Sequence, residues 1–233
     1  VLHLLYARFW HKVLFDLGLV STSEPFQTLR NQGLVTAKAY KRPGGGYVAP
    51  GDVKREGDKV SAPDGGELLE IVEKMSKSKL NGITPDQIVK DYGADALRLY
   101  EMFMGPFDKE KLWNSDALSG CRRFLNRFYD LVDSDKVVDG AEGDGVRLAH
   151  KLVKGVTEDL EGMLFNTCIS KMMEFINDFA PLKEYPREAL KMAIQVLSPF
   201  APHLAEECWE KIGEKSELSY EPFPSYDEAL LVE

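Results

Sequence analysis

Lysine and serine side chains that could bind phosphate gather in one short run, Lys74-Met75-Ser76-Lys77-Ser78-Lys79. When a carboxylate attacks the α-phosphate of ATP, negative charge builds on the phosphoryl oxygens and on the leaving pyrophosphate. Lysines that close on these atoms in the transition state lower the barrier of such an adenylation. Serine hydroxyls can position the run by hydrogen bonds to backbone or phosphate. The residue types fit a nucleotide-binding loop, although a lysine- and serine-rich run taken alone is usually a solvated loop.

The elements predicted on both sides of this run favour the nucleotide-binding interpretation. Residues 34–73 alternate turns with short β-prone stretches at 34–37, 47–49 and 59–61. After the run, Asn81-Gly82 predicts a turn, and Thr84 and Pro85 begin a helix with a capping hydroxyl. This order predicts a lysine-bearing loop at the edge of an α/β sheet, where nucleotides bind. Gly82 would let the loop flex as ATP enters and pyrophosphate departs.

The rest of the sequence is predicted to be mainly helical. Residues 2–17 have a broad apolar face with helical spacing, Gly18 is expected to cap that helix, and a second short helix is expected at 24–33. Later helices are expected at about 84–93, 95–104, 115–132, 149–164, 166–179, 186–198 and 204–213. Asn166 is the expected cap of one of them. The short joints between these helices predict a bundle.

Composition and charge exclude several classes of protein. The 233 residues are 44% hydrophobic, which allows a sizeable core. The formal net charge of −9 argues against a protein that coats nucleic acid nonspecifically, but not against a local basic groove. No apolar run approaches the roughly 20 residues that a membrane span requires, so we expect no membrane association and a cytoplasmic location.

The cysteines and histidines predict no metal site. Cys121, Cys168 and Cys208 lie far apart and form no CxxC pair, and the four histidines are scattered. Buried thiols in a reducing compartment are the simplest interpretation of the three cysteines.

The wider sequence resembles the leucyl-tRNA synthetases. The run KMSKS is the second signature of the class I aminoacyl-tRNA synthetases, to which they belong. Other stretches that resemble the family are residues 3–12 (HLLYARFWHK), 92–100 (YGADALRLY), 102–106 (MFMGP) and 197–207 (LSPFAPHLAEE). The resemblance covers about residues 1–225. KMSKS indicates the class alone, whereas the stretch at 3–12 favours leucine over isoleucine, valine or methionine.

The resemblance implies two domains. Residues 1–108 would be the C-terminal part of the class I catalytic domain, with a β-rich insertion at about 34–73 and the KMSKS loop at 74–78. Residues 109–233 would be an α-helical tRNA-binding bundle of the anticodon-binding type. The expected fold class is therefore mainly α: a helical bundle preceded by the C-terminal end of an α/β nucleotide-binding domain with a small β-rich insertion.

Site residues follow from the same resemblance. Lys74 and Lys77 would be catalytic, with Lys77 the stronger candidate. The ATP-binding residues would be Lys74, Met75, Ser76, Lys77 and Ser78. His3 would lie near the amino-acid pocket, and an ordinary helical histidine is the alternative.

An arginine cluster predicts contacts with tRNA. Arg122, Arg123 and Arg127 lie in the helix expected at 115–132, and Arg123 and Arg127 share a face. They could grip tRNA phosphates without reading sequence. A solvated helix face is the alternative interpretation.

The function implied by the resemblance is that of leucine–tRNA ligase. The intact enzyme, expected to be a monomer, would use ATP and Mg²⁺ to activate leucine and would transfer it to tRNA(Leu). The first class signature, HIGH, and the editing domain are absent from these residues, so we expect a piece that supplies half of the ATP site and is inactive alone. Three alternatives stay open: the same piece of an isoleucyl-, valyl- or methionyl-tRNA synthetase, a non-catalytic tRNA-binding helical module, and a structural helical protein in which KMSKS is accidental.

Overall fold

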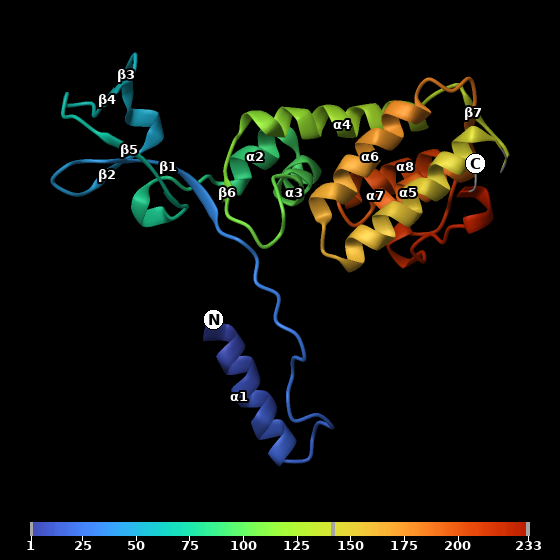
Figure 1. Ribbon diagram of the computed structural model, residues 1–233, viewed down its shortest axis with the longest axis horizontal. Coiled ribbons are helices and arrows are strands. Elements are labelled where there is room, and N and C mark those ends of the chain that lie inside the picture. The colour runs from blue at the N-terminus through green and yellow to red at the C-terminus, as the bar shows by residue number, and fades with distance from the viewer. Residues whose placement is uncertain (1, 141–142, 232–233) are drawn as a thin grey trace. The chain divides into compact units, whose positions relative to one another are not determined.

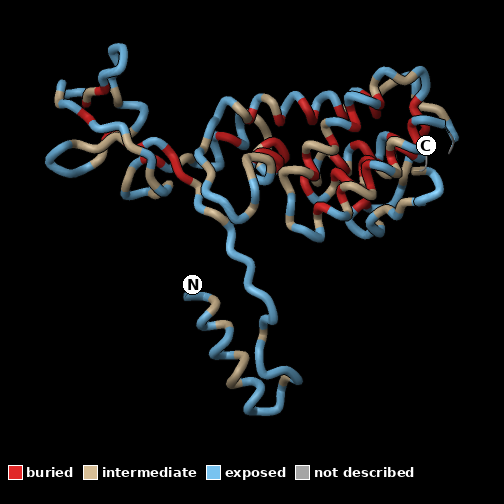
Figure 2. Tube along the Cα trace, viewed as in Figure 1, coloured by how far each residue is buried: buried red, intermediate tan, exposed pale blue. Residues whose placement is uncertain are grey.

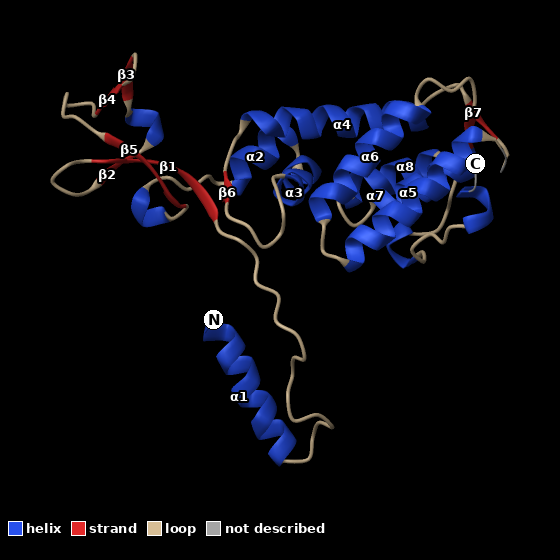
Figure 3. Cartoon of the chain, in the orientation of Figure 1, coloured by secondary structure: helices blue, strands red, loops and turns tan. Residues whose placement is uncertain are grey.

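The computed structural model describes residues 2–140 and 143–231, and helices dominate it (Figure 1). The described residues form eight α-helices: α1 (Leu2–Asp16), α2 (Pro85–Tyr92), α3 (Ala94–Phe103), α4 (Asp116–Val132), α5 (Asp144–Glu161), α6 (Phe165–Phe179), α7 (Arg187–Leu197) and α8 (Pro202–Lys211). Strands are short and gather mainly between α1 and α2 (Figure 3). The predicted fold class, mainly α with a β-rich insertion, is confirmed.

The chain divides into two compact units, Val1–Gln32 and Gly33–Glu233. In the first unit, α1 ends at the predicted cap, where Gly18 has a φ of +71° and the N–H of Leu19 donates to the carbonyl of Leu14. The segment after α1 is attached to it by Glu24, whose carboxylate accepts from Arg8 Nε at 2.7 Å and from Lys12 Nζ at 2.8 Å. The predicted apolar face is present but exposed, since none of the described α1 side chains is buried.

The short helix predicted at residues 24–33 is wrong, because this segment is a loop. Its large apolar side chains, Phe26 and Leu29, are both exposed, so a helix here would bury almost nothing. Isolated helices of about this length are marginal in water without such packing.

In the second unit, the β-rich region is built around one long strand. The described strands are β1 (Val35–Lys41), β2 (Tyr47–Val48), β3 (Lys54–Glu56), β4 (Lys59–Ser61), β5 (Leu69–Lys74), β6 (Lys111–Leu112), β7 (Val137–Val138) and β8 (Tyr185–Pro186). The central strand β1 is antiparallel to β2 and β5 and parallel to β6. Strands β3 and β4 form a separate hairpin. The β-prone stretches predicted from the sequence are confirmed, whereas β5 was not foreseen as a strand.

The helices α2 to α8 share one apolar core, where the buried residues concentrate (Figure 2). The bounds of these helices lie within two residues of the predicted ones, because each helix buries one face of a helical period. The exception is α5, which begins five residues before the predicted 149 and ends three residues before the predicted 164. The α6 cap is a correction: Leu164 is the N-cap residue, and Asn166 is inside the helix. Within the described residues the Asn166 Oδ1 atom is buried without a hydrogen-bond partner.

A carboxylate joins α3 to the start of α8. The buried side chain of Asp95 accepts from the backbone N–H of Leu204 at 2.7 Å, and its other oxygen lies 2.8 Å from His203 Nδ1. The bond from Leu204 satisfies a backbone N–H group that a helix start leaves without an intrahelical partner. The segment that follows the KMSKS run is thereby attached to the bundle.

The three cysteines are buried and free, as predicted. Burial raises the pKa of Cys121 and Cys168 to about 11 and that of Cys208 to about 12. Neutral, buried thiols of this kind are inert packing groups.

Two glycines in α5 give a matched test of the packing. A Cβ added at Gly145 would lie 2.8 Å from Pro186 Cδ and 2.9 Å from Phe179 Cε2, both in the core. We expect Gly145→Ala to lower the free energy of unfolding by about 1–3 kcal/mol, because the overlap outweighs the better helix propensity of alanine. Denaturant unfolding monitored by circular dichroism measures this change.

Gly155→Ala is the control in the same helix. There a Cβ would meet the end of the Lys171 side chain, with Cδ at 3.0 Å, whose Nζ is paired with Asp159 at 2.6 Å. Only the methylene groups of this side chain have to shift, whereas core atoms would have to shift around Gly145. We expect no loss of stability, or a gain of up to about 1 kcal/mol from helix propensity. Equal losses for both substitutions would contradict the packing described around Gly145.

Candidate functional site

The KMSKS run leaves the sheet at the end of β5. Lys74 is the last residue of that strand and pairs with Thr36 of β1. The N–H of Met75 still donates to the carbonyl of Val35, at 3.0 Å. The chain then turns through the short 3-10 helix η2 (Lys77–Lys79), and Leu80 reverses it with a φ of +54°. The motif therefore begins at the last residue of a paired strand and continues through one turn.

The side chain of Asn81 fastens this turn to the sheet. Its Oδ1 accepts from the N–H of Ser76 at 2.9 Å. Its Nδ2 lies 3.4 Å from the carbonyl oxygens of Ala37 in β1 and Glu73 in β5. The residue is only 3% exposed, so these backbone groups replace water as its partners. From the sequence, Asn81 was expected only as part of a turn.

The third lysine of the run is held by an ion pair. Lys79 Nζ lies 2.9 Å from one Glu73 oxygen, and the Tyr47 hydroxyl of β2 donates to the other at 2.7 Å. The Tyr47 hydrogen bond and, next, the Lys79 ammonium hold the pKa of Glu73 below its ordinary value. The same bond raises the pKa of Tyr47. Lys79 is thus neutralised locally and directed toward the sheet.

The other two lysines are free for a ligand. Lys74 and Lys77 are exposed, and neither takes part in an ion pair among the residues that the structure describes. Ser76 and Ser78 lie between and beside them, with their hydroxyl oxygens 3.3 Å apart. Met75 is half-buried and faces less solvent than its neighbours. The turn presents two unpaired ammonium groups and two hydroxyls, which is the chemistry that binds a polyphosphate.

His3 lies in the other unit. It is exposed on α1, where no hydrogen bond to its ring is found within residues 2–140 and 143–231. Its proposed place near an amino-acid pocket stays a prediction.

The three arginines of α4 do not form one group. Arg122 donates to the carbonyl of Tyr92 at 3.3 Å, at the end of α2. Arg127 donates to Asn177 Oδ1 of α6, at 3.0 Å. Arg123 has no hydrogen-bond or ion-pair partner in the described part of the chain. All three are exposed, so their contact with tRNA stays a prediction, with Arg123 the one whose donors are available.

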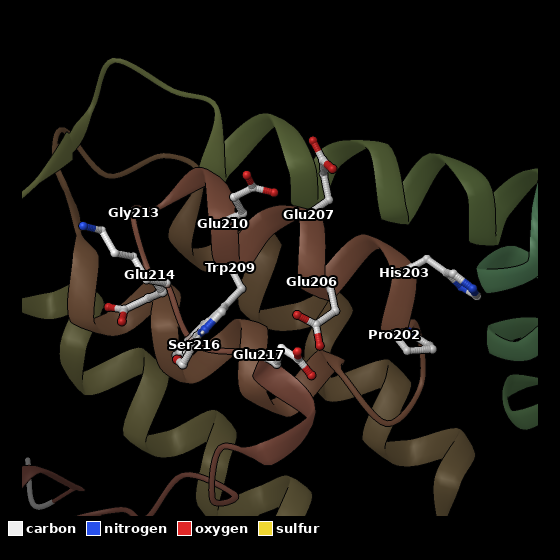
Figure 4. Close-up of a pocket in the computed structure, with 11 residues that line it drawn as sticks. Pro202, His203, Glu206, Glu207, Trp209, Glu210, Gly213, Glu214, Ser216 and Glu217 are labelled. Carbon is white, nitrogen blue, oxygen red and sulfur yellow. Dashed lines mark hydrogen bonds between the residues drawn. The ribbon is translucent and has the colours of Figure 1, made fainter.

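A large hollow on α8 does not contain the predicted site residues. It measures about 830 Å³ and its rim carries glutamates from α8 and the loop after it (Figure 4): Glu206, Glu207, Glu210, Glu214 and Glu217. Glu206 accepts from the backbone N–H groups of Leu218 and Ser219, both at 3.1 Å, and so holds that loop. Clustered carboxylates repel phosphate, and the hollow does not fit a nucleotide.

Neither a metal-binding cluster nor a helix able to span a membrane is found among the described residues. Outside residues 1, 141–142 and 232–233, no three His, Cys, Asp or Glu side chains are placed to share a metal ion. Near the KMSKS turn, Glu70 and Glu73 are already paired with cations. None of the helices that the structure describes has both the length and the apolar character needed to cross a membrane.

Two protein families match separate parts of the chain. Residues 70–112, which include β5, the KMSKS turn, α2 and α3, match the family of class I tRNA synthetases for isoleucine, leucine, methionine and valine (I, L, M and V). Residues 146–233 match the anticodon-binding domain of tRNA ligases. The first match contains Lys74, Lys77 and Asn81, and the second contains most of the helical bundle.

Curated relatives match the chain from end to end. The leucine–tRNA ligase of Protochlamydia amoebophila is 58% identical over 100% of this chain, and that of Chlamydia pneumoniae is 54% identical over 100%. The chain is similar along its whole length to one part of these leucine–tRNA ligases. It spans 28% of the length of each of these two ligases. Leucine is thereby favoured over the isoleucine, valine and methionine alternatives, as the stretch at 3–12 had predicted.

A solved leucine–tRNA ligase agrees in fold. The Agrobacterium radiobacter K84 agnB2 LeuRS, in its LeuRS–tRNA–LeuAMS ternary complex, superposes with a TM-score of 0.71 and 28% identity. The match covers 100% of this chain and 28% of that one. The arrangement of elements is therefore that of the corresponding part of a leucine–tRNA ligase.

Proposed function

We propose that this chain supplies the KMSKS half of an ATP site and a tRNA-binding helical domain in a leucine–tRNA ligase. That enzyme activates leucine with ATP and transfers it to tRNA(Leu). The observation that carries the proposal is the contrast among three neighbouring lysines. Lys79 is paired with Glu73, whereas Lys74 and Lys77 stand unpaired on a turn fixed to the sheet. The backbone of these two lysines is held by the sheet, and their ammonium groups have no carboxylate partner. Such groups can stabilise the negative charge that develops in the transition state.

The proposed chemistry is an in-line displacement at the α-phosphate. A leucine carboxylate oxygen forms a bond to the α-phosphorus, and the bond from that phosphorus to the bridging oxygen of pyrophosphate breaks. The products are leucyl-adenylate and pyrophosphate, which carries away the electron pair of the broken bond. Lys77 and Lys74 would stabilise the charge on the phosphoryl oxygens and on pyrophosphate. Mg²⁺ would accompany ATP, since that ion is commonly held by substrate phosphates together with one or two carboxylates.

The proposed tRNA contact lies on the helical bundle. The chain carries a net charge of −9, so a phosphate contact has to be local. Arg123 is exposed on α4 and available, while Arg122 and Arg127 would first have to release Tyr92 and Asn177. The related LeuRS was solved together with tRNA, which supports this partner for the present chain.

Pyrophosphate exchange tests the proposed function. In the protein at its natural length we expect ATP–pyrophosphate exchange that depends on leucine. Valine, whose side chain has one methylene group fewer than that of leucine, should support it about 10- to 200-fold less efficiently. Isoleucine, which carries its methyl branch on the β-carbon, should also support it less efficiently than leucine. Residues 1–233 alone are expected to show none, because their sequence lacks the HIGH signature. Salt-dependent tRNA binding without any such exchange at natural length would contradict the proposal and favour a non-catalytic tRNA-binding module.

A further inference from the structure

Asn81 is the buried polar group closest in sequence to the KMSKS turn. It is 3% exposed, and its amide has one acceptor and two donor hydrogens. The acceptor receives the N–H of Ser76 at 2.9 Å, and the donors face the carbonyls of Ala37 and Glu73 at 3.4 Å. Three of the four hydrogen-bonding positions of the amide are used on backbone, since its oxygen can accept two bonds. An apolar residue of the same size would fill this space but would leave the N–H of Ser76 without this partner.

The position of these partners shows what the amide controls. Ala37 and Glu73 are opposite each other in the β1–β5 pair, which is the rigid end of the contact. Ser76 lies on the turn outside this pair, between Lys74 and Lys77. The single hydrogen bond to Ser76 thus fixes the backbone between the two unpaired lysines relative to the sheet. Leu80, with its φ of +54°, brings the Asn81 side chain back under the turn.

We infer that Asn81 is a positioning residue that holds the Ser76 backbone so that Lys74 and Lys77 meet the phosphates of ATP together. The inference rests on the proposed function, since the phosphates are those of the adenylation reaction. Asn81 itself is buried and would not touch the nucleotide. It acts through the lysines, and most strongly through Lys77, which follows Ser76 directly.

The kinetic consequence of losing this bond is specific. In Asn81→Ala the turn would keep its lysines but lose their placement. We expect kcat for leucine-dependent pyrophosphate exchange to fall by up to about 100-fold, the cost of a displacement of about 1 Å at a reacting group. The KM for leucine should stay unchanged, because leucine does not contact this turn in the proposed mechanism.

A double-mutant cycle separates positioning from general stability. If Asn81 acts through Lys77, then Asn81→Ala should cost much less in a Lys77→Ala background than in the unaltered protein. Independent losses that multiply would overturn the inference, as would an unchanged kcat in Asn81→Ala. Thr84→Ala is the matched control: Thr84 lies three residues further along, is exposed, and makes no side-chain capping bond. It should leave exchange unaltered.

Two additional measurements keep the inference falsifiable. Asn81→Ser keeps a polar side chain at this buried position, so we expect this variant to fold. The serine side chain is too short to reach all three partners, so kcat should fall as it does in Asn81→Ala. Amide hydrogen exchange should become faster at Ser76 in both variants, while the amides of the β1–β5 ladder keep their protection. Unchanged protection of Ser76 would overturn the inference. This readout needs no catalysis, so it tests Asn81 even if leucine-dependent exchange proves absent and the proposed function fails.

Discussion

Replacing Lys77 by alanine is expected to lower kcat for leucine-dependent pyrophosphate exchange by about 10²–10³-fold, the usual cost of losing one charge-stabilising donor. Lys77 begins η2, is exposed, and is unpaired among the described residues, so its ammonium is available to the phosphates. Because it would bind them most strongly in the transition state, the KM for leucine should change little. Steady-state exchange rates at saturating ATP and leucine measure the effect.

Substitutions of two other lysines serve as controls, one for the loss of a positive charge and one for the position of the lysine in the run. Lys59 is exposed in β4, in the separate β3–β4 hairpin, and Lys59→Ala removes the same charge away from the turn. It should leave exchange unaltered. Lys79→Ala removes a lysine that is already paired with Glu73, so its effect should be smaller than that of Lys77→Ala. If Lys77→Ala were as active as Lys59→Ala, the catalytic role of the motif would be refuted.

The sequence predicted the bundle well because its helices bury one face each. The helix predicted at 115–132 is found as α4 (Asp116–Val132), and the one predicted at 186–198 is found as α7 (Arg187–Leu197). Apolar side chains at the helical period can be recognised without knowing their partners. The same signal found α1, although its apolar face is exposed in this chain. Periodicity therefore identifies a face that can be buried, and not what covers it.

The errors have a common physical origin in contacts between distant residues. Strand β5 has a mixed, half-charged sequence and exists because it pairs along its length with β1. The role of Asn81 depends on Ala37, 44 residues earlier in the chain. Arg127 is engaged by Asn177, 50 residues later. No local pattern contains these partners, so the sequence can indicate the motif but not the groups that hold it.

The residues expected to bind ATP were easier to predict from the sequence than the residues that hold them in place. Residue types and the predicted elements on both sides indicated the run as a nucleotide-binding loop, and the resemblance to the leucyl-tRNA synthetases singled out Lys74 and Lys77. The structure places Lys74 at the end of β5 and the rest of the motif on the turn that follows. Nothing in the run itself distinguishes Lys79 from the other two lysines. That distinction comes from Glu73 and Tyr47, which lie in different strands of the sheet.

Replacing Phe179 by alanine is expected to lower the free energy of unfolding by about 3–5 kcal/mol, as for other large aromatic residues in cores. Phe179 is fully buried at the end of α6. Its ring centroid lies 4.9 Å from that of Phe175 and 5.0 Å from that of Tyr185. A domain is typically stable by only about 5–15 kcal/mol, so this loss would leave little margin. Chemical denaturation of the protein measures it, and Tyr220→Ala, at a side chain 85% exposed, should change stability by less than about 0.5 kcal/mol.

The ring of Phe179 also links this prediction to the one for Gly145. A Cβ at Gly145 would lie 2.9 Å from Phe179 Cε2, so the two substitutions affect the same space. Once the ring is gone, one of the two overlaps of the added methyl group disappears, and the methyl group partly fills the cavity. Gly145→Ala should therefore be less harmful in a Phe179→Ala background than alone, with a coupling energy of about 0.5–3 kcal/mol. Strict additivity would show that the two residues do not touch, and would contradict the packing of α5 on α6 from which both predictions follow.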